Sequence, residues 1–103
     1  MIEEIFDHYS DTTFLKADGF DVAVIGVSED FNSPPRLIYS VKKVIDIIMK
    51  DMVITKHDLR DDEIKDGMTI QDKKHELATE YFNFNISGAY VGEATPVWCH
   101  DDF

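Results

Sequence analysis

Residues 80–98 read EYFNFNISGAYVGEATPVW, and this stretch predicts a helix end, a chain reversal and a final strand in close succession. The helix is expected to begin at Thr69, because TIQD resembles a capping box in which Asp replaces the usual Glu or Gln. It is expected to run to about Ile86. Its predicted core face, set by helical spacing, consists of Ile70, Leu77, Tyr81 and Phe84, with Ala78 and Phe82 beside it.

Two glycines and a proline predict how the chain leaves this helix. Gly88 is a candidate left-handed cap at the helix end, and Gly92 marks a further turn. Pro96 is expected to begin a short strand over residues 96–99, where its missing N–H is tolerated.

Residues 36–52, RLIYSVKKVIDIIMKDM, predict a strand that passes directly into a second long helix. The strand covers residues 36–39, and Ser40 is well placed as the helix N-cap. The polar side chains of this helix are expected on the side opposite its apolar stripe. That stripe consists of Val41, Val44, Ile45, Ile48 and Met52, widened by Ile47 and Met49.

Residues 21–27, DVAVIGV, predict another strand, and their near-continuous apolar run indicates burial on both faces. Residues 28–35, SEDFNSPP, are expected to form a polar loop that joins the two strands as an antiparallel hairpin. Residues 1–9 place apolar side chains at three- and four-residue spacing, which predicts a short helix with acids near its positive end.

The chain is therefore expected to be one α+β domain, residues 1–103. We expect a small three-stranded, mainly antiparallel sheet with two longer helices on one face and a short N-terminal helix. Residues 53–68 are open between a loop and a short helix, attached through Leu59, Ile64 and Met68. The tail from His100 to Phe103 is expected to be frayed.

Composition limits the class of protein. The sequence is 44% hydrophobic, which predicts a folded chain, and no apolar run reaches the roughly 18 residues of a membrane span. A single cysteine, Cys99, and an acidic start without a basic region before an apolar stretch predict a cytoplasmic location. The net charge of −11 argues against direct binding to nucleic acid and is compatible with a protein partner that has a basic surface.

The negative charge is concentrated in residues 1–30, which hold eight acids and one base, Lys16. These carboxylates could form a surface that resembles a phosphate array. The alternative is an acidic face that serves only solubility. Among the aromatic side chains, Tyr90 and Trp98 remain as contact anchors, because Tyr81, Phe82 and Phe84 have core spacing. The interaction candidates are Glu3, Glu4, Asp7, Asp11, Asp18, Asp21, Glu29, Asp30, Tyr90, Glu93 and Trp98.

Three other patterns favour structure over chemistry. The acids around His57, residues 57–66, are oxygen-rich like a Mg²⁺ or Ca²⁺ site, but they lack the EF-hand spacing and are interleaved with Lys and Arg. Cys99 and His100 would point to opposite faces of a strand, so they do not predict a nucleophile and its base. Residues 88–92, GAYVG, follow a helix where a phosphate loop would precede one. We therefore expect no catalytic residue, metal or cofactor.

Three segments, DGFDVAVIGV, RLIYSVKKVIDIIMKDM and EYFNFNISGAYVGEATPVW, resemble a group of small bacteriophage-encoded proteins. The resemblance covers residues 18–52 and 68–99, while residues 53–67 are longer than the link expected there. It implies a phage protein expressed in a bacterial host, and it brings no catalytic residues with it.

The function expected from these observations is binding of a host or phage macromolecule without catalysis, with inhibition of a defence or nucleic-acid-processing system as its effect. The alternative is a protein that binds or sequesters a nucleotide or metabolite. Its pocket would lie between the helix expected over residues 69–86 and the GAYVGE segment. The oligomeric state is open.

Overall fold

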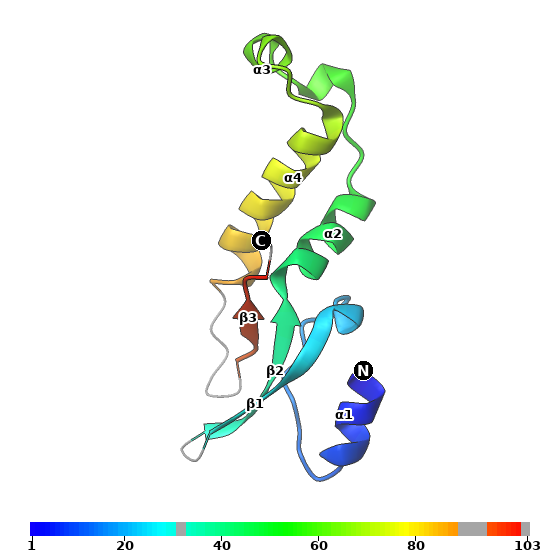
Figure 1. The fold of residues 1–103 in the computed structure, drawn as a ribbon, viewed down its shortest axis with the longest axis vertical. Helices are drawn as coiled ribbons and strands as arrows, with labels where there is room; N and C mark the ends of the chain where they lie inside the picture. The colour runs from blue at the N-terminus through cyan, green and yellow to red at the C-terminus, as the bar shows by residue number, and fades with distance from the viewer. Residues whose placement is uncertain (31–32, 89–94, 102–103) are drawn as a thin grey trace. The chain divides into compact units, whose positions relative to one another are not determined.

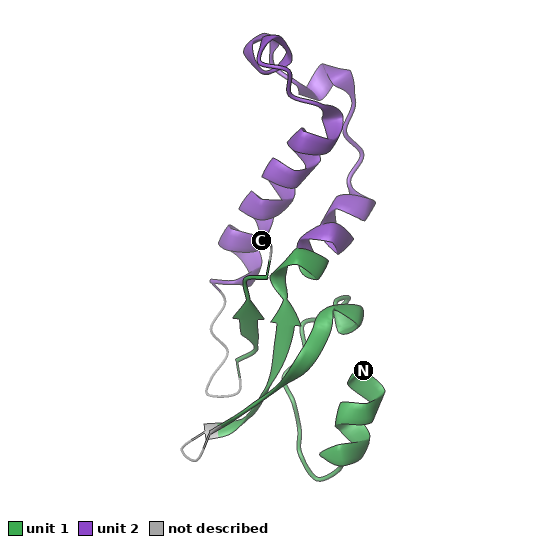
Figure 2. Cartoon of the chain, in the orientation of Figure 1, with its two compact units in different colours: residues 1–44, 89–103 green, residues 45–88 purple. Residues whose placement is uncertain are grey.

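The computed structural model describes residues 1–30, 33–88 and 95–101, with only the backbone described at Asp30 and Ser33. The chain forms two compact units, residues 1–44 with 89–103 and residues 45–88, which we call the sheet unit and the helical unit (Figures 1 and 2). Helices and strands occur together, which confirms the α+β class. The elements are α1 (Ile2–His8), η1 (Asp21–Ala23), β1 (Val24–Asp30), β2 (Ser33–Ser40), α2 (Val41–Asp51), η2 (Lys56–Asp58), α3 (Asp61–Lys65), α4 (Ile70–Tyr81), η3 (Phe82–Ile86) and β3 (Val97–Cys99).

The sheet has three strands in the order β1-β2-β3 (Figure 1). β1 and β2 form the expected antiparallel hairpin, whereas β3 pairs with β2 in parallel through Ile38–Val97, Tyr39–Trp98 and Ser40–Cys99. The sheet is therefore mixed, because the long helical connection between β2 and β3 brings the chain back to run in the same direction. Two further expectations involve both units at once: that the chain is a single domain, and that both long helices lie on one face of the sheet. Both stay predictions.

The hairpin differs in its bounds from the expected one. Residues 21–23 form the short 3₁₀ helix η1, and most of the expected loop 28–35 belongs to the two strands. Pro34 and Pro35 lie in β2 next to a register irregularity, between the pairs Ser28–Arg36 and Asp30–Ser33, where the regular ladder is already interrupted.

Burial of the first strand on both faces is wrong for most of its length. Ala23 and Val24 are buried, but Val22 is 76% exposed and residues 25–28 are half-buried. At Val22 the tighter geometry of the 3₁₀ turn replaces the alternation of a strand, and residues 25–28 belong to β1, an edge strand of the sheet.

The junction between β2 and α2 is built around the Ser40 hydroxyl, which is fully buried. As predicted for an N-cap, Ser40 Oγ accepts the Lys43 backbone N–H, at 3.1 Å. The same hydroxyl donates to Asp101 Oδ2 at 2.6 Å, and Asp101 Oδ1 accepts the Lys42 N–H at 3.2 Å. Asp101 thus satisfies a second free N–H of the helix start.

The expectation of a frayed tail from residue 100 is wrong at Asp101, because that carboxylate is fixed by α2. Phe103 and its neighbour at 102 lie outside the described residues.

The core of the sheet unit centres on Tyr39, which is fully buried. Its hydroxyl accepts the Ala17 backbone N–H at 2.9 Å, and its ring lies 5.2 Å from that of Trp98 between centroids. Burial raises the pKa of the Tyr39 hydroxyl. The buried apolar side chains of the described residues are Ile2, Ala23, Val24, Leu37, Tyr39, Val41, Val44, Ile45, Met49, Ala78 and Phe82.

The apolar stripe of α2 is confirmed, with Val41, Val44, Ile45 and Met49 buried. Ile48 and Met52, also assigned to it, are half-buried. The charged side chains of this helix are exposed on the other side, as expected from the amphipathic pattern.

In the helical unit, short elements begin with local carboxylate caps. Asp58 accepts the Thr55 N–H at 2.8 Å at the start of η2, and Glu63 accepts the Arg60 N–H at 2.9 Å at the start of α3. The predicted box at Thr69 is confirmed: the Thr69 N–H donates to Asp72, and Asp72 N–H donates to Thr69 Oγ1, at 3.0 and 3.1 Å. Residues 53–68 therefore contain short helices.

The predicted helix over residues 69–86 is confirmed in extent, but its last turn is a π-helix, η3, closed by a bond from Ser87 N–H to the Phe82 carbonyl at 2.9 Å. Phe82 is buried as expected, with Ala78 one turn before it. Tyr81 and Phe84, which we assigned to the core face, are 51% and 83% exposed.

This difference is a rotation of the helix about its axis. Ala78 and Phe82 are four residues apart, so they share one face of the helix, and this is the face that is buried. Gly88 is not left-handed, so its predicted capping role is wrong; the positive φ angles of the described residues occur at Gly19 and Gly67. Gly92 lies outside the described residues.

We expect Ser40→Ala and Asp101→Ala each to lower the free energy of unfolding by about 1–2 kcal/mol, because each removes a cap of α2. The two losses should combine to less than their sum, since both variants break the same hydrogen bond. Urea unfolding of the single and double variants measures both effects. Asp11→Ala, at an exposed position of the same unit, is the control and should change stability by less than about 0.5 kcal/mol.

The hydrogen bond from Ser40 lowers the pKa of Asp101, with support from the Lys42 N–H. A carboxyl whose pKa is lower in the folded chain stabilises it above the unfolded pKa, about 3.9, and loses this effect as pH falls through the folded pKa. The stability difference between wild type and Asp101→Ala should therefore be constant near neutral pH and shrink below about pH 4. A difference that persists at low pH would contradict this role.

Candidate functional site

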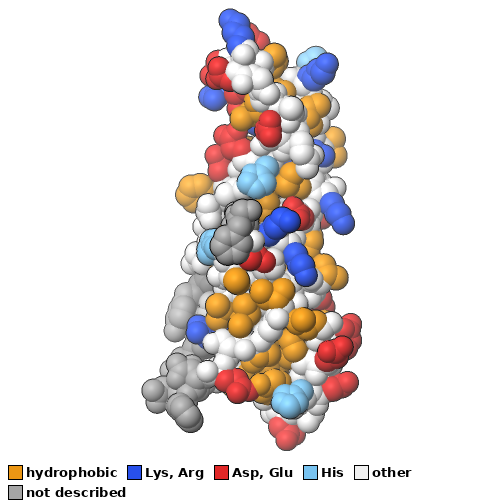
Figure 3. All heavy atoms as spheres, in the orientation of Figure 1, with side chains coloured by type: hydrophobic (Ala, Val, Ile, Leu, Met, Phe, Trp, Pro, Cys, Tyr) orange, Lys and Arg blue, Asp and Glu red, His pale blue; other side chains and the backbone are white. Residues whose placement is uncertain are grey.

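The acids of α1 form an exposed group in the sheet unit. Glu3, Glu4 and Asp7 are exposed, and Glu3 and Asp7 lie on one side of the helix because they are four residues apart. Figure 3 shows Asp and Glu side chains gathered over α1. Glu3 and Glu4 lie in the first turn, where the helix dipole favours negative charge.

The remaining acidic candidates of residues 1–30 have different surroundings. Asp11 and Asp18 are exposed, whereas Asp21 is half-buried and pairs with Lys16, Nζ to Oδ2, at 3.3 Å. Glu29 is exposed and accepts a hydrogen bond from the Tyr9 hydroxyl. The side chain of Asp30 is outside the described residues.

Aromatic contacts fix α1 to the residues that come after it. The rings of Phe6 and Phe14 stack with centroids 5.9 Å apart, and Tyr9 meets Phe14 edge-on at 5.7 Å. Lys16 lies over Phe6, with Nζ 5.7 Å from the ring centroid. Since Tyr9 also binds Glu29 of β1, the acids of α1 are presented from a helix that is anchored within the sheet unit.

We call the seven described carboxylates of this unit's first 30 residues the acidic face. They are Glu3, Glu4, Asp7, Asp11, Asp18, Asp21 and Glu29. Within the described part of the chain, Glu4, Asp7, Asp11 and Asp18 form no ion pair. The structure thus places the predicted acids in one unit, with most of their charge uncompensated by near neighbours.

Of the candidates near the end of the chain, only Trp98 lies among the described residues. Trp98 lies in β3, half-buried, with its ring against that of Tyr39. Its role as a contact anchor stays a prediction. Tyr90 and Glu93 lie outside the described residues, as does most of the segment proposed to border a ligand pocket.

Two of the acids near His57 form hydrogen bonds or ion pairs within the helical unit. Asp58 binds Thr55 through the backbone N–H and the hydroxyl, and Glu63 binds Lys73. Over the described ranges, no three His, Cys, Asp or Glu side chains are grouped to hold a metal ion.

Cys99 and His100 are also placed by the structure. Cys99 is half-buried in β3, and His100 is exposed beyond it. Asp101, the third member of that sequence, accepts hydrogen bonds at the start of α2 with both carboxylate oxygens.

An apolar pocket of about 570 Å³ lies in the helical unit, which the sequence did not predict. Four apolar side chains line it, and the polar lining comes from Lys56, Thr69 and Gln71. Leu59 and Met68 are half-buried, and Ile64 of α3 is 52% exposed. The fourth apolar side chain is Ile70, the first residue of α4.

A buried ion pair holds α3 against α4 beside this pocket. Glu63 is 6% exposed, and its Oε2 lies 3.0 Å from Lys73 Nζ, while Arg60 Nε lies 3.4 Å from its Oε1. The Arg60 N–H, together with Lys73, lowers the pKa of Glu63, and hydrogen bonding to Glu63 raises the pKa of Lys73. The pair therefore fixes the helix that carries Ile64.

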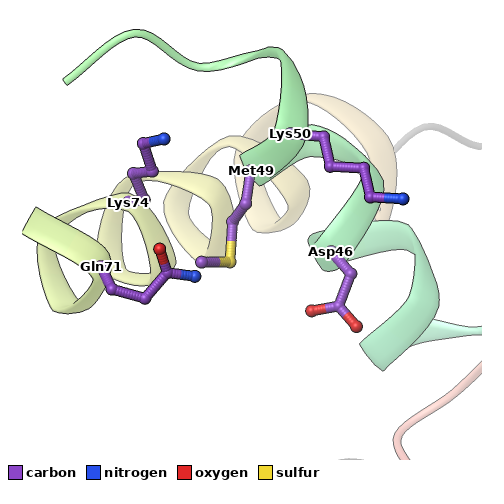
Figure 4. Close-up of a pocket in the computed structure, with 5 residues that line it drawn as sticks. All are labelled: Asp46, Met49, Lys50, Gln71 and Lys74. Atoms are coloured by element: carbon purple, nitrogen blue, oxygen red, sulfur yellow. The ribbon is translucent and has the colours of Figure 1, made fainter.

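A second hollow, of about 430 Å³, lies between α2 and α4 (Figure 4). Met49 points from α2 toward α4, and the Gln71 side chain points toward Met49. The Lys74 side chain rises from α4, and the Lys50 side chain extends away from it, so the two ammonium groups lie apart and do not converge on one ligand group (Figure 4).

Comparison of the chain with protein-family models, curated proteins and solved structures finds no match. Across the described residues, no helix is both long enough and apolar enough to cross a membrane.

We expect Glu63→Gln to lower stability near pH 7 more than Glu76→Gln, a matched control whose carboxylate is 42% exposed and 4.0 Å from the same Lys73. The loss should be full between about pH 4.3 and 10.4, the ordinary pKa values of Glu and Lys. It should shrink as pH falls through the lowered pKa of folded Glu63, and also as pH rises through the raised pKa of folded Lys73. Thermal unfolding across this pH range measures it; equal losses for the two variants would contradict the role of the pair.

Proposed function

We propose that the protein is a non-enzymatic binding protein of a bacteriophage, acting in the cytoplasm of the bacterial host. In this proposal, the acidic face binds a basic surface on a host or phage protein. The consequence would be inhibition of a defence or nucleic-acid-processing system, because basic surfaces of this kind are the ones that hold phosphate backbones.

The observation that carries the proposal is the excess negative charge of α1 and the residues after it. Glu3 pairs with the N-terminal ammonium at 3.7 Å, whereas Glu4 and Asp7 form no ion pair within the described residues. Residues 1–30 hold eight acids against one base, and that base, Lys16, is paired with Asp21. Exposed carboxylates without ion pairs project their field over about 8–10 Å at ordinary salt, which increases the rate of encounter with a basic partner.

The geometry of α1 supports the same proposal. A helix places side chains four residues apart at a Cβ spacing of about 5–6 Å, so Glu3 and Asp7 present neighbouring charges along one line. The packing of Phe6 on Phe14 limits the freedom of this helix. A preorganised array loses less entropy on binding than acids on a free tail would lose.

The non-enzymatic part of the proposal rests on the carboxylate nearest Cys99 and His100 in the sequence. Both carboxylate oxygens of Asp101 bind the start of α2, through Ser40 and Lys42, which supports a structural role for this residue.

Affinity capture from the infected host, followed by quantitative mass spectrometry, tests the proposal with two variants of equal charge change. The first neutralises α1 (Glu3→Gln, Glu4→Gln, Asp7→Asn). The second neutralises three exposed acids of the helical unit (Asp61→Asn, Asp62→Asn, Asp66→Asn). If each lost ion pair contributes about 0.5 kcal/mol, the first variant should bind the captured protein about tenfold more weakly. The second should bind like wild type.

Salt provides the independent check. Binding of the captured protein should weaken steeply between low salt and about 0.5 M, because exposed charges are screened. Binding that is insensitive to salt, or equally weakened by both variants, would rule out recognition through the acidic face.

A further inference from the structure

The apolar pocket of the helical unit has the size and lining of a ligand site. Its volume, about 570 Å³, lies within the range of roughly 300–1,000 Å³ that small-molecule sites occupy. The apolar side chains come from the residue after η2, from α3, from the segment before α4 and from the first residue of α4, so separate parts of the chain line one space. Met68 adds an unbranched side chain that adapts its shape to an apolar ligand.

Polar contacts hold the elements that form the walls of the pocket. The Thr55–Asp58 bonds hold η2, the Glu63–Lys73 ion pair holds α3, and the Thr69–Asp72 box holds the first turn of α4. The pocket is therefore formed before any ligand enters, which reduces the free energy lost on binding.

Charge identifies the class of ligand. Lys56 is the one charged residue among those that line the pocket, and within the described residues its ammonium forms no ion pair. No carboxylate is among the lining residues: Asp58 and Asp72 accept backbone N–H groups at the helix starts, and Glu63 pairs with Lys73. An apolar molecule in this space would thus have Lys56 as the one charged residue in its lining.

The hollow of Figure 4 differs in the two properties that matter. Its lining includes Asp46 and two lysines whose ammonium groups lie apart, with Met49 as the apolar contribution. It therefore has no continuous apolar surface, and its lining carries charges of both signs.

We propose that the apolar pocket binds a small molecule with an apolar body and one anionic head group, the head pairing with Lys56. The class is that of medium-chain carboxylates. This site is separate from the acidic face, and neither proposal depends on the other.

The test uses three ten-carbon probes that differ in head group: decanoate, decanol and decyltrimethylammonium, each below its aggregation concentration. Titrations of the full chain are followed by amide chemical shifts, which report both affinity and location. We expect decanoate to shift the amides of residues 56, 59, 64 and 68–71 and to bind at least about threefold more tightly than decanol. The cation should bind most weakly, because Lys56 repels it.

Variants then separate the apolar and charged contributions. Ile64→Asp should weaken decanoate binding about tenfold or more, because it places a like charge and a polar group in the pocket wall. Val53→Asp, at an 88% exposed position of the same unit, is its matched control and should leave binding unchanged. Lys56→Gln should abolish the preference for decanoate over decanol, while Lys65→Gln, on the exposed side of α3, should keep it.

The wild-type probe series needs no variant and stands even if Ile64→Asp unfolds. Absence of decanoate binding would overturn the proposal, as would shifts confined to other residues. Equal binding of the carboxylate and the ammonium probe, or a preference that survives Lys56→Gln, would refute the assigned head group.

Discussion

The buried hydroxyl of Ser40 is the contact on which the rest of the structure depends. It lies where β2 becomes α2, it accepts the Lys43 N–H, and it donates to Asp101. A fully buried hydroxyl must find partners, since an unsatisfied one costs about 1–3 kcal/mol. Here the partners are the start of a helix and a carboxylate from the far end of the chain. One side chain therefore sets the helix start and the position of the segment that contains β3.

The helical unit is stabilised in a different way. Few of its side chains are buried, and its short elements begin with carboxylates that accept backbone N–H groups at Thr55, Arg60 and Thr69. Such caps act between residues three apart, so they specify structure where a core is too small to do so. The ion pair of Glu63 with Lys73 adds the connection between α3 and α4. Polar contacts of this kind also leave apolar side chains free to line a pocket.

Local interactions explain what the sequence could predict. The cap at Ser40, the box at Thr69 and the hairpin depend on neighbouring residues and were predicted, as was the exposure of the acids in α1. Asp101 could not be identified, because its partner Ser40 is 61 residues away and no pattern links them. The exposure of Phe84 results from packing of Ala78 and Phe82, which periodicity alone cannot distinguish from the neighbouring face. The pocket was not predicted either, because its lining residues, from Lys56 to Gln71, come together only when separate short elements pack against one another.

The parallel pairing of β3 with β2 has a consequence for the order of events in the cell. The whole helical unit, residues 45–88, lies in sequence between the two strands. A ribosome adding about 5–20 residues each second will complete β1, β2 and the helical unit before β3 emerges. Until then, one edge of β2 presents unpaired backbone groups to any other strand in reach. During this stage the edge of β2 that later pairs with β3 is open to strands of other proteins. Once β3 has emerged, the hydrogen bond from Ser40 to Asp101 helps to hold this short strand on that edge.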